Sequence, residues 1–254
     1  FIILLLQIKM GNLIYKKKEK KQSESLLHLI NFNSNSLSNN IHNNNIFINF
    51  VNCYKNKDVI LCGQGFRNFD LVEIKDNSNY FLDAHLGLLI YTNLNTCKFI
   101  SYVYKNQSKY DVRKYGFIKN KINYKSNQLV IYNTEIISNH QNNIIFNDKT
   151  KSKQIKELIY DIYKYNCKIN IIFACIQSYN NKIKKFINIS NINNILNSDN
   201  DSYIFIYSKK MIDEDGFDIN NFLNDEFKLE IIEENIYNHD KSYPFELVIK
   251  LKKL

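Results

Sequence analysis

Apolar and polar positions recur along this chain with two periods, one typical of strands and one typical of helices. The clearest unit lies between Lys168 and Lys209. The run Ile169 to Phe173 is apolar and rich in β-branched residues, which predicts a strand buried on both faces. Apolar residues then recur at spacings of three and four over 183–196, the pattern of an amphipathic helix. A second apolar run at 203–207 completes the unit, which predicts two parallel strands joined by a crossover helix.

The same two periods predict the remaining elements. Strands are expected at 46–51, 59–62, 69–74, 98–104, 129–132, 229–232 and 245–251. Helices are expected at 24–31, 81–94, 109–122, 155–165 and 217–227. The last two strands read as an antiparallel pair that joins the parallel sheet. The fold class expected is therefore α/β, with a mainly parallel sheet, flanking helices and an antiparallel pair of strands near the carboxyl terminus.

The domain organisation follows from length and local composition. The chain has 254 residues, and no stretch rich in Pro, Gly or Ser divides it. Residues 1–45 are basic and rich in Asn, and we expect them to be a mostly disordered tail. Residues 46–254 are expected to form one α/β domain that begins with a small β-hairpin, and the protein is expected to be a monomer.

The net charge and the cysteine usage limit the kinds of partner and the cellular compartment that we expect. The net charge is +9, but Lys is scattered among Asn and Glu, and the only Arg residues are Arg67 and Arg113. This favours a solvated surface over a nucleic-acid interface, with phosphate or an anionic membrane as the alternative. The five Cys show no C-x-x-C spacing, so we expect reduced core thiols, Cys167 and Cys175 among them, and no metal site. Reduced thiols point to a cytoplasmic protein.

The first residues carry a candidate membrane signal. Phe1 to Ile8 are apolar but far fewer than the roughly 20 residues that a spanning helix needs. If Met10 is the start, Gly11 followed by the basic stretch Lys16–Lys21 resembles a myristoylation sequence with a polybasic patch. That pattern asks for Ser or Thr where Tyr15 stands, so the alternatives are weak contact with a membrane surface and a disordered basic tail.

Two further features suggest chemistry without requiring it. Gly63-Gln64-Gly65 follows an apolar run, as in a nucleotide-binding loop, but the residues after it alternate as in a strand, which favours a β-hairpin. His85 falls on the apolar face of the expected helix 81–94, where a buried histidine with a structural role is the ordinary interpretation. No catalytic triad or paired-carboxylate arrangement stands out, so the catalytic residues remain unknown.

Three segments resemble motifs of one enzyme family. Residues 81–91 are similar to an entry helix, 170–179 to a motif that follows the fourth strand, and 204–231 to a fifth strand with its closing helix. These are motifs of the seven-stranded class I S-adenosylmethionine-dependent methyltransferases, and the likeness is strongest to the protein-lysine methyltransferases. The resemblance implies a Rossmann-like fold, S-adenosylmethionine as cofactor and a protein substrate methylated on lysine.

The resemblance also implies which residues would hold the cofactor. Asp83 in the entry helix and Tyr179 in the motif after the fourth strand are the positions that match. The family's glycine-rich cofactor loop is missing after Leu94, where glycine would let the backbone approach the cofactor. Either a segment after Leu94 is missing from this sequence or the cofactor site has decayed. Two functions follow: an active or formerly active protein-lysine methyltransferase, or a non-catalytic protein-interaction module with the amino-terminal residues as a membrane tether.

Overall fold

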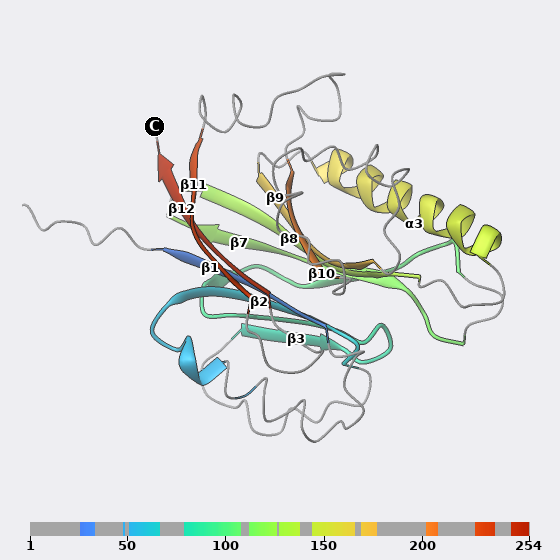
Figure 1. Ribbon diagram of the computed structural model, residues 1–254, viewed down its shortest axis with the longest axis horizontal. Helices are drawn as coiled ribbons and strands as arrows, with labels where there is room; N and C mark the ends of the chain where they lie inside the picture. Colours follow the sequence, from blue (N-terminus) through green and yellow to red (C-terminus); the bar gives the residue numbers. More distant parts are fainter. Residues whose placement is uncertain are drawn as a thin grey trace, which may run out of the picture.

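Two six-stranded β-sheets pack face to face, and one long helix lies against the outer side of one of them (Figure 1). The computed structural model describes residues 26–33, 48, 51–66, 79–107, 112–125, 127–137, 144–165, 169–176, 202–207, 227–236 and 245–253. The helix is α3 (Ile144–Tyr165).

Each sheet mixes strand directions. The first sheet, called sheet A, has the order β11-β12-β1-β2-β4-β3; the second, sheet B, has the order β10-β9-β8-β7-β5, with β6 also paired to β7. Sheet A contains β1 (Leu27–Asn33), β2 (Asp58–Gln64), β3 (Asn79–Asp83), β4 (Leu88–Thr92), β11 (Phe227–Ile236) and β12 (Phe245–Lys253). Sheet B contains β5 (Asn95–Thr96), β6 (Ile100–Val103), β7 (Gly116–Tyr124), β8 (Asn127–Ile136), β9 (Ile169–Ile176) and β10 (Ser202–Tyr207).

The strand directions correct the expected fold class. Only β1 with β2, and β8 with β9, run parallel among the described strand pairs; the others are antiparallel. β10 pairs with β9 in the antiparallel direction, so these two strands are not the parallel pair that the sequence predicted. The parallel neighbour of β9 is β8, and α3 is the crossover between them. The fold is a mixed two-sheet sandwich and not a mainly parallel Rossmann-like sheet.

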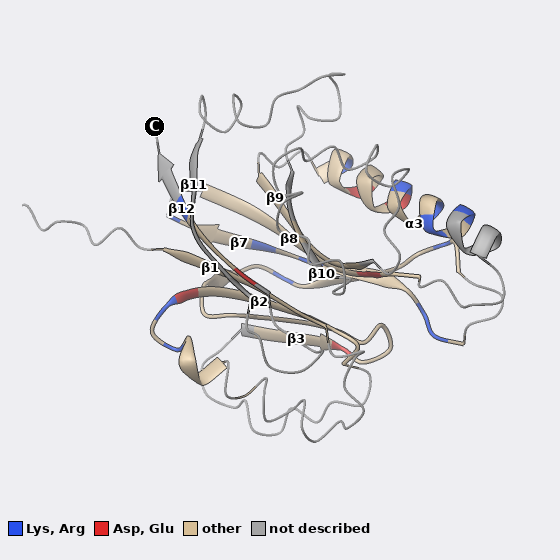
Figure 2. Ribbon diagram, viewed as in Figure 1, with Lys and Arg blue, Asp and Glu red and all other residues tan. Residues whose placement is uncertain are grey.

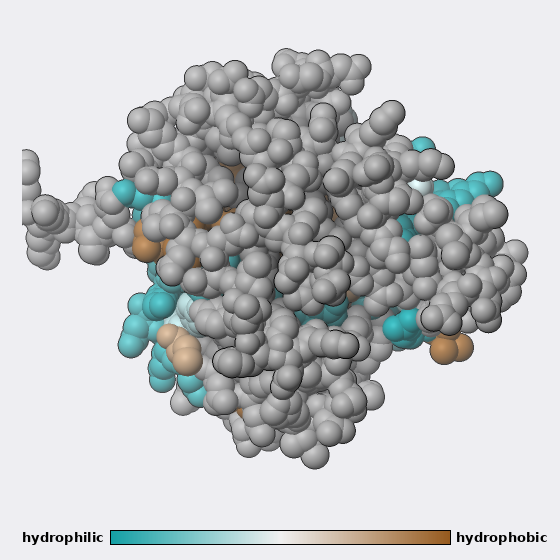
Figure 3. Space-filling view, viewed as in Figure 1, coloured by the Kyte–Doolittle hydropathy of each residue, from teal (hydrophilic) through white to brown (hydrophobic). Residues whose placement is uncertain are grey.

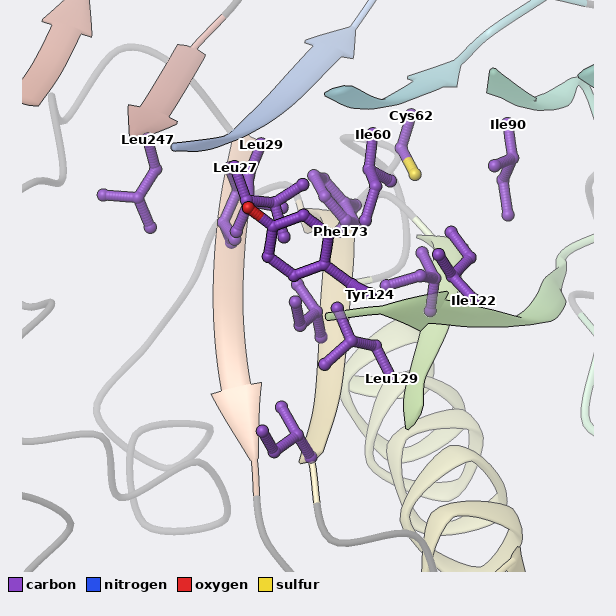
Figure 4. Close-up of a cluster of buried hydrophobic side chains, with 14 of the residues drawn as sticks. Leu27, Leu29, Ile60, Cys62, Ile90, Ile122, Tyr124, Leu129, Phe173 and Leu247 are labelled. Atoms are coloured by element: carbon purple, nitrogen blue, oxygen red, sulfur yellow. The ribbon is translucent and has the colours of Figure 1, made fainter. Parts of the chain in front are cut away.

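The main core fills the space between the two sheets. Inward side chains of sheet A, such as Leu29, Ile60 and Ile90, face those of sheet B, such as Leu129 and Phe173, and all five are fully buried (Figure 4). Each strand supplies these residues at every second position, because successive side chains of a strand point to opposite faces. Burial of apolar area at about 25 cal/mol per Å² makes this layer the main source of stability.

The helix α3 covers the outer face of sheet B. Ile155, Leu158 and Ile162, at helical spacing, pack against residues of β7 and β8 such as Phe117 and Tyr132. Its polar side chains add further ties: Lys119 on β7 pairs with Asp161 at 2.6 Å, for example. Figure 2 shows lysines along both α3 and β7, and Figure 3 shows hydrophilic residues at the surface around α3. No described helix is both long enough and apolar enough to cross a bilayer.

Several expected elements are confirmed. The helix expected at 155–165 is the second half of α3. Strands occur where the sequence predicted them at 59–62, 98–104, 129–132, 169–173, 203–207, 229–232 and 245–251. The last two pair in the antiparallel direction as expected, but through β12 they join β1 in sheet A and not the sheet that contains β9.

Three expected helices are wrong. Residues 24–31 overlap β1, residues 81–94 form most of the hairpin of β3 and β4, and residues 109–122 include most of β7. β1 and β7 each hydrogen-bond to strands on both sides, which outweighs local helix propensity. Instead of a strand at 46–51, the described residues 48 and 51–53 are helical.

Other expectations fall on residues outside the described part. These are the helix at 183–196, most of the helix at 217–227, the strand at 69–74, Cys167, and the amino-terminal signal with Gly11 and Lys16–Lys21. Cys62 and Cys175 are buried, as expected, whereas Cys53 and Cys97 are exposed and are not core thiols. The division between residues 1–45 and 46–254 stays a prediction, although β1 lies in the first segment.

Candidate functional site

The carboxyl ends of β1, β2, β8 and β9 meet at one end of the sandwich. Hydrogen bonds between the sheets fix this arrangement: Asn31 on β1 donates to the carbonyl oxygen of Ala174 on β9 at 3.3 Å, and Gln64 on β2 donates to Asn133 on β8 at 2.7 Å. β12 begins at the same end, since Phe245 pairs with Asn31. Ligands of open sheets containing parallel strands bind outside the carboxyl ends of those strands, so this end is the candidate site.

Polar side chains replace the apolar core at this end, and we call them the strand-end pole. On β1 the inward series runs Leu27, Leu29, Asn31, Asn33. The inward series of β2 ends in Gln64, that of β8 in Asn133 and Glu135, and that of β9 in Cys175 after the core residue Phe173. The strand-end pole consists of Asn31, Asn33, Gln64, Asn133, Glu135 and Cys175, all on the inward face of their strands. Because the series changes character where four strands end together, the pole is a continuation of the core and its side chains are held by the sheets.

The innermost layer of the pole is a cluster of three amides. Asn31, Gln64 and Asn133 are fully buried. The Gln64 Nε2 group donates to Asn31 Oδ1 at 2.7 Å and to Asn133 Oδ1 at 2.7 Å. One amide group therefore connects β2 to its neighbour β1 and to β8 in the opposite sheet.

The Asn133 amide ties the sheets together a second time. Its Nδ2 group donates to the carbonyl oxygens of Gly63 at 2.9 Å and Leu89 at 2.7 Å, both in sheet A. With its Oδ1 accepting from Gln64, the side chain has three partners across the interface between the sheets. Buried polar groups with partners of this kind fix the relative position of packed sheets.

The outer layer of the pole is less uniform. Asn33 Nδ2 lies 3.0 Å from Cys175 Sγ, which joins β1 to β9. Glu135 pairs in register with Cys175 and is only 5% exposed, and it is the one carboxylate among the pole residues. Lys151 on α3 is also fully buried, and both charged residues make interactions within the protein.

Of the two residues proposed to hold S-adenosylmethionine, the structure describes only Asp83. Asp83 ends β3, and its Oδ1 accepts the Leu86 backbone N–H at 3.0 Å, closing the turn to β4. Gly87 in that turn has a positive φ of 69°, which ends any helix and suits a hairpin. His85 is exposed in the same turn and is not a core residue. Tyr179 lies outside the described residues.

The Gly63-Gln64-Gly65 sequence also has a different role from the one expected. Gly63 and Gln64 lie inside β2, whose neighbours are β1 and β4, so the glycines do not form the turn of a hairpin. A Cβ at Gly63 would collide with the ring of Phe66, while Gly65 has a φ of 84° just after the strand. The glycines therefore shape the exit from β2 next to the pole.

Comparison with solved structures identifies the fold. Neither a family model nor a curated protein matches the sequence. The structure is similar to D. rerio TDP2 complexed with single-strand DNA product, with a TM-score of 0.60 and 10% identity over 89% of this chain and 99% of that chain. It is also similar to an endonuclease/exonuclease/phosphatase from Bacteroides vulgatus, with a TM-score of 0.59 and 10% identity over 90% of this chain and 100% of that chain.

A third similar structure carries metal. This is the beta toxin from Staphylococcus aureus with bound magnesium ions, with a TM-score of 0.57 and 15% identity over 88% of this chain and 99% of that chain. The chain thus has the endonuclease/exonuclease/phosphatase fold, and the methyltransferase resemblance is wrong. The expectation that the chain binds S-adenosylmethionine depended on that resemblance and is wrong as well.

The described part of the pole does not fit a magnesium ion. Mg²⁺ is held in proteins by carboxylates together with water and substrate phosphates. Among the residues that the structure describes, no group of three or more His, Cys, Asp or Glu is placed to hold a metal. The amide oxygens of Asn31 and Asn133 already accept hydrogen bonds from Gln64. Burial also raises the pKa of the Cys62 thiol next to the amide layer, which keeps it neutral.

Proposed function

We propose that this chain is a phosphoester hydrolase whose substrate binds at the strand-end pole. The observation that carries the proposal is the position of the pole, where polar side chains gather at the ends of four strands. The fold is similar to that of an endonuclease/exonuclease/phosphatase and to that of TDP2, which was solved with a single-strand DNA product. Protein contacts, membrane contact through Gly11 and Lys16–Lys21, a monomeric state and a cytoplasmic location stay predictions.

The described residues would contribute hydrogen bonds and one carboxylate. Asn33, in the outer layer, can donate from its amide to an oxygen of a bound phosphate. Glu135 is the described pole residue able to accept a proton from an attacking water, the role of a general base. A proton acceptor held by a strand is well fixed for this task, because its position is set by the sheet.

Hydrolysis of bis(p-nitrophenyl) phosphate and of p-nitrophenyl phosphate tests the proposal and separates diesters from monoesters. We expect Glu135→Gln to lower kcat by about 100-fold, the usual contribution of a general base. Glu157→Gln, a change of the same kind on α3, is the matched control and should keep activity. Equal activity of Glu135→Gln and the wild type would remove Glu135 from the mechanism.

A second candidate is recognition of phosphoesters without hydrolysis. The amide layer favours it, because its three neutral amides bring neither charge nor a base to the pole, which leaves the outer amide of Asn33 as the donor to a ligand. Calorimetric titration with bis(p-nitrophenyl) phosphate would then show binding that Asn33→Ala weakens, with no nitrophenol released. A protein that neither binds nor hydrolyses these phosphoesters would refute both candidates.

A further inference from the structure

Two carbonyl oxygens in the amide layer converge on one point. The Oδ1 atoms of Asn31 and Asn133 both lie 2.7 Å from Gln64 Nε2. Their orientation is fixed from behind, because Asn31 Nδ2 donates to the Ala174 carbonyl and Asn133 Nδ2 donates to the Gly63 carbonyl. Turning either amide over would place its oxygen against a carbonyl oxygen, so both oxygens must point inward.

A point between two converging carbonyl oxygens attracts positive charge, and such oxygens are typical ligands of hard cations. In this chain the point holds the partly positive NH₂ group of Gln64. We propose that the Gln64 amide takes the place of a divalent cation in the strand-end pole, so that the two sheets are joined there without metal. This inference concerns metal and the joint between the sheets, and it stands whether or not the pole hydrolyses phosphoesters.

Burial and charge support the assignment. Asn31, Gln64 and Asn133 are fully buried. A divalent ion at their centre would lose its water and gain no carboxylate from these three residues, which is strongly unfavourable. The neutral NH₂ group makes two hydrogen bonds at the same point and costs far less to bury than a divalent ion, so the wild-type cluster excludes the ion.

The substitution Gln64→Glu should turn this point into a site that favours a cation. It replaces the donor by a carboxylate that faces two carbonyl oxygens, which repel it when no cation is present. A divalent ion would then have a carboxylate and two amide oxygens around it, a suitable set of hard oxygen ligands. The variant should therefore be unstable in a chelator and stabilised by metal.

Thermal unfolding in EDTA and in millimolar Mg²⁺, Mn²⁺ or Ca²⁺ tests the inference, with each protein refolded under the same condition. We expect the Tm of the wild type to stay the same in all of them. The Tm of Gln64→Glu should be lower in EDTA and rise by about 5 °C or more with at least one of the ions, the scale of shift that ligand well above its dissociation constant gives.

Two controls isolate the effect. Gln64→Leu removes the donor without adding charge and should lose stability with no recovery in metal. Gln154→Glu changes another fully buried glutamine, which accepts from the Ile137 backbone and donates to the Asn106 carbonyl, where two carbonyls do not converge; metal should not rescue it. Recovery of either control would contradict the assignment.

Two outcomes would overturn the inference. A wild-type Tm that rises with a divalent ion, together with calorimetric binding that Gln64→Leu abolishes, would show a metal at this point. A folded Gln64→Glu protein that is indifferent to metal would also overturn it. If Gln64→Glu folds in neither condition, the titrations of the wild type and Gln64→Leu decide. Failure of the hydrolysis assay leaves these results unchanged, so the two proposals are tested separately.

Discussion

The substitution Asn133→Ala removes a side chain that makes three hydrogen bonds between the sheets. The wild-type amide donates to the carbonyl oxygens of Gly63 and Leu89 and accepts from Gln64. Three hydrogen bonds at about 1 kcal/mol each give about 3 kcal/mol, and the buried Gln64 donor left without this partner adds about 1 kcal/mol. A loss of about 4 kcal/mol is a large part of the 5–15 kcal/mol that typically stabilises a domain.

Urea unfolding followed by far-UV circular dichroism or tyrosine fluorescence measures this loss, since the chain has 18 Tyr and no Trp. In thermal unfolding, the same loss should lower the Tm by roughly 10 °C, at about 2–4 °C per kcal/mol for a chain of this size. Asn123→Ala on β7 is the matched control: the side chain is exposed, and the expected change is below about 0.5 kcal/mol. If Asn133→Ala costs less than about 1 kcal/mol, the amide layer does not join the sheets as argued.

Three further changes test other parts of the fold. Gly116→Ala should lower stability by about 3 kcal/mol or give insoluble protein, as judged by the yield of soluble protein, because its Cβ would collide with the backbone oxygen of Tyr102 on β6. In urea unfolding, Glu246→Ala should lower stability by about 3 kcal/mol by breaking the buried 2.6 Å contact with His28, while changing both residues to Leu should recover most of it. Burial raises the pKa of Cys62 above its ordinary value of 9.0, so the unfolded thiol ionises first and stability falls as pH rises past 9. Burial also raises the pKa values of Tyr91, Tyr102 and Tyr104, so part of the fall is common to the wild type and Cys62→Ala. In urea titrations from pH 8 to 10.5, the wild type should lose up to about 1.4 kcal/mol per pH unit more than Cys62→Ala; equal slopes would show that the buried thiol ionises normally.

The sequence predicts several elements of the fold but not their partners. The rhythm of α3 and the β-branched runs of β9 and β10 are strong enough to be found locally. The hairpin of β3 and β4 was predicted as a helix because its leucines satisfy both a period of two and spacings of three and four. Whether two strands run parallel depends on contacts between residues far apart in sequence. The sequence predicts a parallel pair for β9 and β10, and this wrong direction is what favours the methyltransferase resemblance.

The candidate site was harder to predict than the fold, although its signal is in the sequence. No motif marks the pole, because its residues come from four separate strands. The change from Leu27 and Leu29 to Asn31 and Asn33 at successive inward positions is visible once the strand is known. The expected helix at 24–31 conceals this change, because a helix puts Leu27 and Leu29 on different faces and puts Leu27 and Asn31 on the same face. Asp83 matches the entry-helix motif of the methyltransferases, but in the structure it closes the turn between β3 and β4.

The position of the pole follows from topology, and its chemistry follows from a few side chains. Each parallel pair, β1 with β2 and β8 with β9, needs a crossover that leaves from a carboxyl end. Because the two pairs pack against each other with these ends together, both crossovers begin at the pole. Loops that start there can vary without disturbing the sheets, which is how one fold can serve several functions. In this chain the inner wall is made of amides whose hydrogen bonds connect the sheets, so a charge placed there must come from the ligand, from Glu135 or from residues beyond the described strands.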